Sequence, residues 1–189
     1  LNPPSISEIA PRLFLGNFSS SYDVETLKKH SITSTLSLMT EKSPRWMDPH
    51  VQHHVSAARR LFIPAVDADW MDILSKLDEI CEFIDKQLAM PIGTVPGGVL
   101  VHCRMGISRS ATVVIAYLMK KHGQSVDEAL AAVRAKRRIV SPNAGFLEQL
   151  QAWGKIKYDL WEVPGKVPKR EYTEFLRRWD ERQEAAKRK

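Results

Sequence analysis

The chain has 189 residues and a mass of 21.5 kDa, which is enough for one domain with a short addition. Hydrophobic residues make up 43% and charged residues 26% of the sequence, and these near-average values exclude wholesale disorder. The formal net charge is +6, of which residues 155–189 contribute four charges. Mixed charges at helical spacing usually form a solvated face, so we expect no direct sequence-specific binding to nucleic acid.

Cysteine use is sparse, because Cys81 and Cys103 are the only two in the sequence. Two cysteines cannot form a disulfide framework, and such sparse use favours a reducing compartment. No apolar run approaches the roughly 20 residues that a membrane span needs. The chain begins Leu-Asn-Pro-Pro without Met and has no signal-like apolar segment. We therefore expect a processed or trimmed fragment of a cytoplasmic or nuclear protein.

The first half of the chain alternates strand and helix patterns. A helix is expected over residues 22–30, and the polar segment 40–58, rich in His, Ser and Pro, is expected to be a loop. Short apolar runs predict strands over residues 9–15, 33–39 and 61–64. This alternation is typical of βαβ units, in which neighbouring strands run parallel.

The second half is dominated by helices around one strand. Apolar side chains on one face predict a helix over residues 70–88, a Pro/Gly-bearing connection spans 90–98, and the continuous run Val99–Val101 is typical of a central strand. Further helices are expected over 110–121, 126–138, 143–158 and, after a linker at 163–168, 170–187. We predict an α/β fold: a short, mostly parallel, twisted sheet flanked by helices, with a C-terminal helical extension.

The segment His102–Ser110 lies at the junction between the apolar strand and the following helix. A loop that enters a helix N-terminus directs unpaired N–H groups at one point, and the helix dipole adds positive charge there. Gly106 allows a tight turn, and Arg109 offers a charged fork for two phosphate oxygens. The junction is therefore predicted to bind phosphate through Arg109 and the loop residues Arg104, Met105, Gly106, Ile107 and Ser108.

Cys103 begins this loop and is the candidate nucleophile. The same positive field favours its thiolate and lowers its pKa below the free value of about 8.5. The alternative is a buried cysteine at an ordinary turn, but that does not explain an arginine facing the same point. Ser110 either caps the helix or donates a hydrogen bond to the thiolate. His102 is expected to support the loop through ring hydrogen bonds rather than act as an acid.

This segment resembles the His-Cys-x5-Arg-Ser signature of the protein tyrosine phosphatase superfamily. The chain length and the segments Ala111–Met119 and Pro142–Leu150 resemble its dual-specificity branch. In that branch, the asparagine matching Asn143 supports the phosphate loop. The resemblance covers about residues 5–155 and implies a catalytic domain over 1–158, followed by a linker and an amphipathic helix over 159–189.

A closer likeness is to atypical dual-specificity phosphatases whose full chains continue into a zinc-binding domain and which are linked to maturation of the large ribosomal subunit. Ser31–Ser37, Leu61–Asp67 and the helix containing Trp153 and Tyr158 resemble that group, although Ser31 stands where glycine is usual. The implied partners are a phosphoprotein substrate and a pre-ribosomal particle. We assign no metal or cofactor to this sequence, because the loop itself supplies the positive field.

A general acid must protonate the leaving oxygen, and Asp67, Asp69 and Asp72 precede the helix expected over 70–88. Asp69 and Asp72 are spaced like a capping pair, which gives them a structural role and leaves Asp67 free. The family pattern also places its acid at the aspartate after Ile-Pro-x-x, which is Asp67. We therefore predict Asp67 as the acid, with Asp69 as the alternative.

Three functions are compatible with these residues. The first is an enzyme that hydrolyses phosphotyrosine and phosphoserine or phosphothreonine through a phosphocysteine intermediate. The second is an assembly module in ribosome maturation that does not need turnover. The third is a phosphoinositide phosphatase.

Two further features have alternative interpretations. Cys81 falls on the apolar face of its helix, so it is expected to be a core residue, with a redox partner of Cys103 as the sharper hypothesis. The helix over 170–187 has a narrow apolar stripe. It either packs on the domain, engages another chain, or forms a stalk towards a downstream region.

Overall fold

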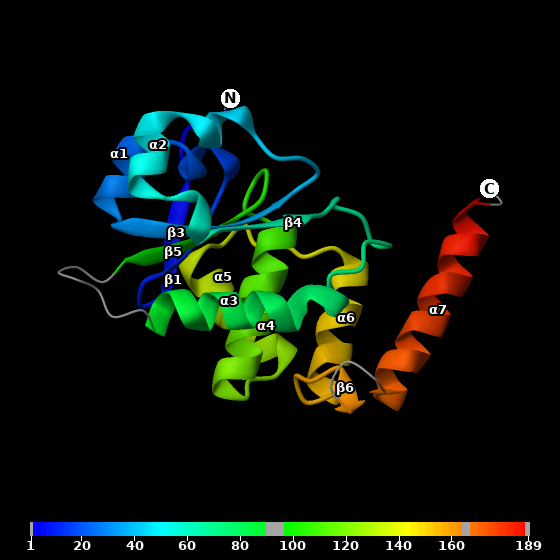
Figure 1. The fold of residues 1–189 in the computed structure, drawn as a ribbon. Helices are drawn as coiled ribbons and strands as arrows, with labels where there is room; N and C mark the ends of the chain where they lie inside the picture. Colours follow the sequence, from blue (N-terminus) through cyan, green and yellow to red (C-terminus); the bar gives the residue numbers. More distant parts are fainter. Residues whose placement is uncertain (1, 90–96, 164–166, 188–189) are drawn as a thin grey trace.

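The computed structural model describes residues 2–89, 97–163 and 167–187 (Figure 1). A five-stranded sheet with the order β1-β2-β5-β3-β4 forms its centre. The strands are β1 (Ile6–Ala10), β2 (Leu13–Gly16), β3 (Ile32–Met39), β4 (Arg60–Pro64) and β5 (Gly98–His102). Only β1 is antiparallel to its neighbour, because β2, β5, β3 and β4 all run parallel. The predicted α/β fold with a short, mostly parallel sheet is confirmed.

Helices cover both faces of this sheet (Figure 1). The helices are α1 (Val24–Lys29), α2 (Pro49–His54), α3 (Leu77–Ala89), α4 (Arg109–His122), α5 (Val126–Lys136), α6 (Ala144–Lys155) and α7 (Arg170–Lys187). Alternate strand residues face opposite sides, so Leu100 joins α1 and α2 in a small core, whereas Val99 and Val101 join α3 to α6 in the main core. The central position of β5 places its C-terminal end, where the predicted phosphate loop starts, between the two helical layers.

The expected strand over residues 9–15 is wrong, because the structure has two strands there. Pro11 and Arg12 form a turn between β1 and β2, and Arg12 has φ +65°. Leu13 pairs with Ala10, so the two strands are an antiparallel hairpin. Proline has no N–H to donate to a sheet, which explains the break at this position.

The expected loop over residues 40–58 is also partly wrong. This segment contains α2 and two short 3-10 helices, η2 (Pro44–Met47) and η3 (Ala57–Arg59). Ser43 and Asp48 accept hydrogen bonds from backbone N–H groups at the starts of η2 and α2. Side-chain caps and proline at N-terminal positions therefore stabilise short helices in a segment without a long apolar pattern.

The other predicted helices agree with the structure to within a few residues, except for the start of the helix over 70–88. A 3-10 turn, η4 (Leu74–Lys76), precedes α3, which begins at Leu77. The N–H groups of Ile73 and Leu74 both donate to Gln149 Oε1, at 2.7 and 2.8 Å. The Gln149 side chain of α6 thus supplies the acceptor that N–H groups at the start of a helix lack within the helix itself.

The C-terminal helix α7 packs on the domain, which was the first of the three interpretations of its apolar stripe. Tyr172, Phe175 and Trp179 are buried in the main core. The expected linker before it contains β6 (Trp161–Val163) and β7 (Val167–Pro168), which pair antiparallel, while residues 164–166 lie outside the described part. Most of the expected connection over 90–98 also lies outside the described residues. The boundary at residues 158 and 159 stays a prediction.

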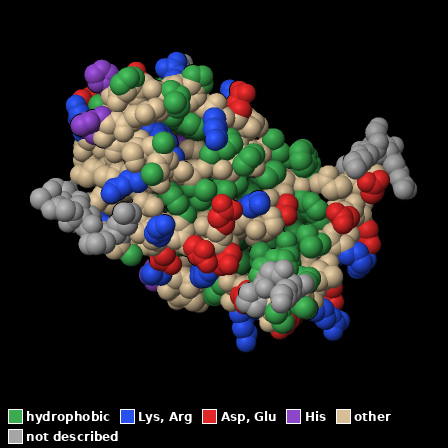
Figure 2. Space-filling view, viewed as in Figure 1, with side chains coloured by type: hydrophobic (Ala, Val, Ile, Leu, Met, Phe, Trp, Pro, Cys, Tyr) green, Lys and Arg blue, Asp and Glu red, His purple; other side chains and the backbone are tan. Residues whose placement is uncertain are grey.

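The surface carries charges of both signs. On the face seen in Figure 2, Lys and Arg side chains lie among Asp and Glu side chains instead of forming one basic patch. Within the described residues, no helix is both long and apolar enough to cross a bilayer.

Candidate active site

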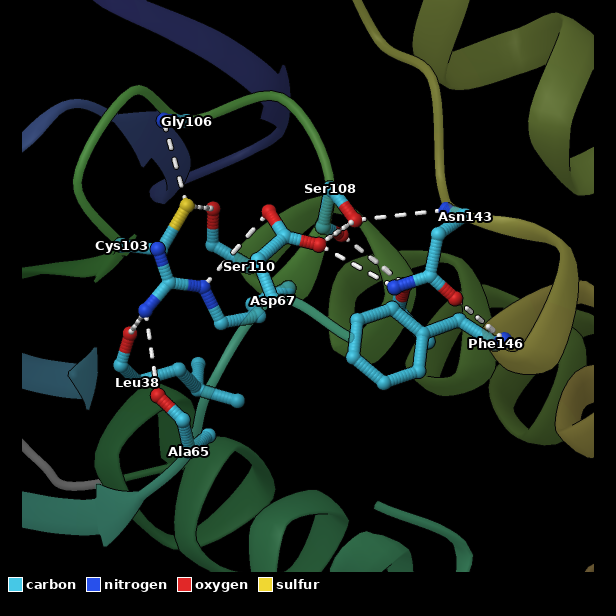
Figure 3. Close-up of polar contacts among 11 residues, drawn as sticks. Leu38, Ala65, Asp67, Cys103, Gly106, Ser108, Ser110, Asn143 and Phe146 are labelled. Carbon is cyan, nitrogen blue, oxygen red and sulfur yellow. Dashed lines mark hydrogen bonds and ion pairs between the residues drawn. The ribbon is translucent and has the colours of Figure 1, made fainter. Parts of the chain in front are cut away.

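Cys103 lies at the start of the loop that joins β5 to α4, and its side chain is buried. The backbone N–H of Gly106 and the hydroxyl of Ser110 both donate to its Sγ, each at 3.2 Å (Figure 3). The capping role considered for Ser110 is wrong, because Ser108 is the N-cap residue of α4. Ser110 instead sits in the first turn of α4, from which its hydroxyl reaches the sulfur.

The surroundings of Cys103 favour its thiolate. Burial alone would raise the pKa of the thiol. The hydroxyl and backbone N–H of Ser110, the charge of Arg109 and the N–H of Ile107 outweigh this effect and lower the pKa of Cys103 below its ordinary value. A thiolate at a helix N-terminus can attack an electrophile at neutral pH.

Arg109 is the first residue of α4, and its guanidinium is held under the same loop. Nη1 donates to the carbonyl oxygens of Leu38 and Ala65, at 3.3 and 3.1 Å (Figure 3). Leu38 is the second-last residue of β3 and Ala65 directly follows β4, so two parallel strand ends fix the direction of the side chain. Nε is buried and makes no hydrogen bond with any described residue. This N–H therefore has no hydrogen-bond acceptor in the described structure, although the carboxylate of Asp67 lies near it.

Asp67 lies between Arg109 and the start of α6, on the loop after β4. Its Oδ2 is 3.7 Å from Arg109 Nε, and its Oδ1 accepts hydrogen bonds from Ser108 Oγ at 2.7 Å and Asn143 Nδ2 at 3.1 Å (Figure 3). The carboxylate side chain is 39% exposed, so substrate and water can reach it. The structure thus places Asp67 in the same cluster as the predicted nucleophile.

The two other aspartates of this loop differ from each other. Asp72 Oδ1 accepts from the backbone N–H of Ser75 at 3.0 Å, which gives it a structural role at the start of η4, although Ile73 is the N-cap residue and the predicted pairing with Asp69 is absent among the described residues. The corresponding role for Asp69 is wrong, because its side chain makes no capping bond among the described residues. Its backbone carbonyl instead lies against Gly145, where a Cβ would come within 1.9 Å. The loop therefore packs tightly on the start of α6.

Asn143 joins the two loops at the site. Its Oδ1 accepts from the N–H of Phe146 at 2.9 Å, which makes it the N-cap of α6. Its backbone N–H donates to Ser108 Oγ at 3.3 Å, and its Nδ2 donates to Asp67. The support of the phosphate loop expected from Asn143 is therefore present, and the same side chain also holds Asp67.

His102 is fully buried behind the loop. Its Nε2 lies 2.7 Å from Ser37 Oγ, and Trp46 packs edge-on against the ring at 5.7 Å. Burial lowers its pKa to about 3, so the ring is neutral near neutral pH. A neutral, enclosed ring fits the predicted supporting role of His102.

The backbone of the loop is tied down on its outer side. Gly106 has φ +69°, and a Cβ there would come within 2.5 Å of the carbonyl oxygen of Gly16. Phe18 N–H donates to the carbonyl of Arg104 at 3.1 Å, and Ser141 N–H donates to that of Ile107 at 2.9 Å. The turn therefore requires glycine at position 106, as predicted. Phosphate binding by Arg104, Met105, Gly106, Ile107, Ser108 and Arg109 stays a prediction.

Arg137 is a functional residue that the sequence analysis missed. It is 5% exposed and donates to the carbonyl oxygens of Gly106 at 2.9 Å and Met105 at 3.2 Å. Its Nη1 also reaches the hydroxyls of Ser5 and Ser7, at 3.1 and 3.4 Å. Arg137 therefore holds two carbonyls of the loop, while the N–H of Gly106 donates to Cys103 Sγ. A basic run at the end of a helix gives no sign of this role.

Cys81 is buried in the main core, as its apolar face predicted. Burial raises the pKa of its thiol to about 12, so it stays protonated where Cys103 ionises. Among the described residues, no group of three or more His, Cys, Asp or Glu side chains is placed to hold a metal ion.

Comparison with known proteins identifies the family. Residues 13–156 match the model of the dual specificity phosphatase catalytic domain. Dual specificity protein phosphatase 1B of Arabidopsis thaliana is 39% identical over 150 residues, which cover 79% of this chain and 82% of the relative. Dual specificity protein phosphatase MPK-4 of Drosophila melanogaster is also 39% identical, over 82% of this chain but 37% of its own length.

A solved structure agrees with these relatives. The crystal structure of the Yvh1 phosphatase domain from Chaetomium thermophilum has a TM-score of 0.73 and 34% identity. The similarity covers 82% of this chain and 99% of that domain. The chain belongs to the dual-specificity phosphatase family and contains its catalytic domain.

Proposed function

We propose that the chain hydrolyses phosphate monoesters of tyrosine, serine and threonine in phosphoproteins, with Cys103 as the nucleophile. The observation that carries this proposal is that the Cys103 sulfur accepts two hydrogen bonds at the start of α4, where the buried guanidinium of Arg109 has an Nε without a hydrogen-bond partner among the described residues. The loop N–H groups and Arg109 would bind the three equatorial oxygens and stabilise the charge that develops on them.

In the first step, the Cys103 thiolate attacks phosphorus and the bond to the leaving oxygen breaks. Asp67 donates its proton to that oxygen, so the products are a phosphocysteine, a free hydroxyl and the Asp67 carboxylate. The hydrogen bonds from Ser108 and Asn143 position Asp67 for this transfer.

In the second step, water attacks the phosphocysteine. The Asp67 carboxylate takes a proton from the water, and the sulfur–phosphorus bond breaks to release phosphate and the thiolate. The Ser110 hydroxyl, 3.2 Å from Sγ, stabilises the departing thiolate. Asp67 is protonated again, and the cycle is complete.

The two cysteines offer a matched test of this proposal. Cys103→Ser should lower the hydrolysis of p-nitrophenyl phosphate and phosphopeptides by about 10⁴-fold or more, because a hydroxyl in this nest is a poor nucleophile. Cys81→Ala should keep a near-normal rate, since Cys81 lies in the core. Equal hydrolysis rates for the wild type and Cys103→Ser would contradict the proposal.

The substrate class needs a separate measurement. A panel of phosphotyrosine, phosphoserine and phosphothreonine peptides, with phosphoinositides beside them, should show turnover of the peptides that Cys103→Ser abolishes. Turnover confined to the phosphoinositides would contradict the proposed protein substrates and indicate a lipid substrate.

We further propose a role with a pre-ribosomal particle, in the cytoplasm or nucleus. Its support is the similarity to the Yvh1 phosphatase domain together with the resemblance to the zinc-bearing atypical group. Complementation of a strain that lacks the gene tests whether this role needs turnover. Full rescue by Cys103→Ser would mean that assembly is independent of catalysis.

A further inference from the structure

A cavity lies between β4 and the segment that contains η2 and α2. Its volume is about 480 Å³, comparable to that of small-molecule sites. The described residues that line it include Ser37, Lys42, Trp46, Ala57, Arg60 and Phe62. The proposed phosphatase reaction uses none of these side chains.

The walls of this cavity are mostly apolar. Trp46 and Phe62 pack edge-on at 6.2 Å, and Met47 is 70% exposed beside them. Trp46 is held in place by a hydrogen bond from its Nε1 to Ser21 Oγ at 2.8 Å. A rigid aromatic wall with an exposed thioether favours a flat apolar or aromatic body.

The charged residues at the cavity are all basic. Lys42 Nζ lies 5.7 Å from the centre of the Phe62 ring, and the Arg60 guanidinium bonds the carbonyl of Val55 at 2.7 Å. None of the described lining residues is acidic. The cavity therefore offers two positive charges beside an apolar surface, with no carboxylate of its own lining to neutralise them.

We propose that this cavity binds a small amphipathic anion, with an aromatic or aliphatic body against Trp46 and Phe62 and one acidic group near Lys42 and Arg60. The proposal is independent of the phosphatase reaction. Ser37 and Trp46, which line the cavity, also contact His102, so the ligand would sit directly behind the catalytic loop.

Isothermal titration with 8-anilinonaphthalene-1-sulfonate tests the site, because this compound joins an aromatic body to one sulfonate. The expected result is one binding event per chain. Ala57→Phe, which fills the cavity from an exposed position, should weaken the affinity at least about tenfold. Lys42→Glu should weaken it similarly, whereas Lys29→Glu, on α1 away from the cavity, should have little effect.

Two controls separate this site from other binding. The uncharged analogue N-phenyl-1-naphthylamine should bind at least about tenfold more weakly, because it lacks the acidic group. Saturating orthovanadate, an anion aimed at the Cys103 loop, should leave the affinity for the sulfonate unchanged. Displacement by orthovanadate, equal affinity for the two dyes, or normal affinity in Ala57→Phe would each overturn the proposal.

Discussion

Gln183 Nε2 donates a hydrogen bond to the backbone carbonyl of Trp70 at 2.9 Å. Gln183 lies on α7, and Trp70 lies on the loop that carries Asp67. On the same helix, Arg182 forms a 2.6 Å ion pair with Glu148 of α6. The helix expected as an extension of the domain therefore contacts the loop of the proposed general acid.

This contact predicts that Gln183→Ala lowers the rate with poor leaving groups more than with good ones. The general acid matters most when the leaving oxygen is basic, so phenyl phosphate should be affected more than p-nitrophenyl phosphate. Loss of one hydrogen bond of about 1 kcal/mol corresponds to roughly a fivefold fall in kcat/KM for phenyl phosphate. Gln151→Ala, at an exposed position on α6, is the control. Equal effects on both substrates would show that α7 does not act through Asp67.

Substitutions at Asn143 can separate its two roles. Asn143→Ser should keep the N-cap of α6 but lose the donor to Asp67, so thermal stability should hold while kcat for phenyl phosphate falls about tenfold. Asn143→Ala should lose both, with a further cost of about 1 kcal/mol in the free energy of unfolding. Thermal unfolding and steady-state kinetics measure the two effects. An unchanged rate in Asn143→Ser would contradict the positioning role.

Removal of the Ser110 hydroxyl should raise the pKa of Cys103. A hydrogen bond to a charged group contributes about 1.5–3 kcal/mol, so Ser110→Ala should move the midpoint of alkylation by iodoacetamide upward by about one to two pH units. The acid limb of kcat/KM should shift in the same direction. Ser108→Ala is not a suitable control, because the Ser108 hydroxyl donates a hydrogen bond to Asp67. Ser75→Ala, distant from the loop in sequence and on η4, serves instead.

The lowered pKa of Cys103 also makes stability depend on pH. Between the lowered pKa of Cys103 in the folded protein and its higher pKa in the unfolded chain, the unfolded chain holds a proton that the folded protein has released. The contribution of Cys103 to stability therefore grows as the pH rises through this window and is complete above it. Denaturation with urea at several pH values should show that Cys103→Ser loses this rise.

Arg137→Lys is expected to damage both stability and the site. A lysine cannot bond two loop carbonyls and two serines with the geometry of a guanidinium, so buried carbonyls lose their donors. The free energy of unfolding should fall by about 2–4 kcal/mol, and inhibition by orthovanadate should weaken about tenfold. Lys136→Met, at the exposed neighbouring position, should change neither. Normal inhibition in a folded Arg137→Lys protein would show that the loop holds its shape alone.

The parts of the site that follow local rules could be predicted from the sequence. The loop from His102 to Ser110 needs only a strand, a glycine turn and a helix start, and all lie in one stretch of chain. Asp67 follows a predicted strand, and parallel strands end at one edge of the sheet. Asp67 follows β4 and Arg109 follows β5, and both strands run parallel to β3 between them, so the two residues lie at the same edge of the sheet.

The parts that depend on distant contacts could not be predicted. Arg137 acts through Gly106 and Ser5, which are far from it in the sequence. The start of α3 depends on Gln149, a polar residue on another helix. The hairpin at Pro11 is different, because a proline inside an apolar run is a local signal of a break.

The clamp of Arg137 has a consequence for how the protein is made. Its side chain joins the first strand of the sheet to the loop of the nucleophile, and Asn143 arrives later still along the chain. A nascent polypeptide that has emerged only as far as Cys103 lacks both groups. The contacts that hold the loop of Cys103 and the side chain of Asp67 can therefore form only after residues 137 and 143 have been synthesised.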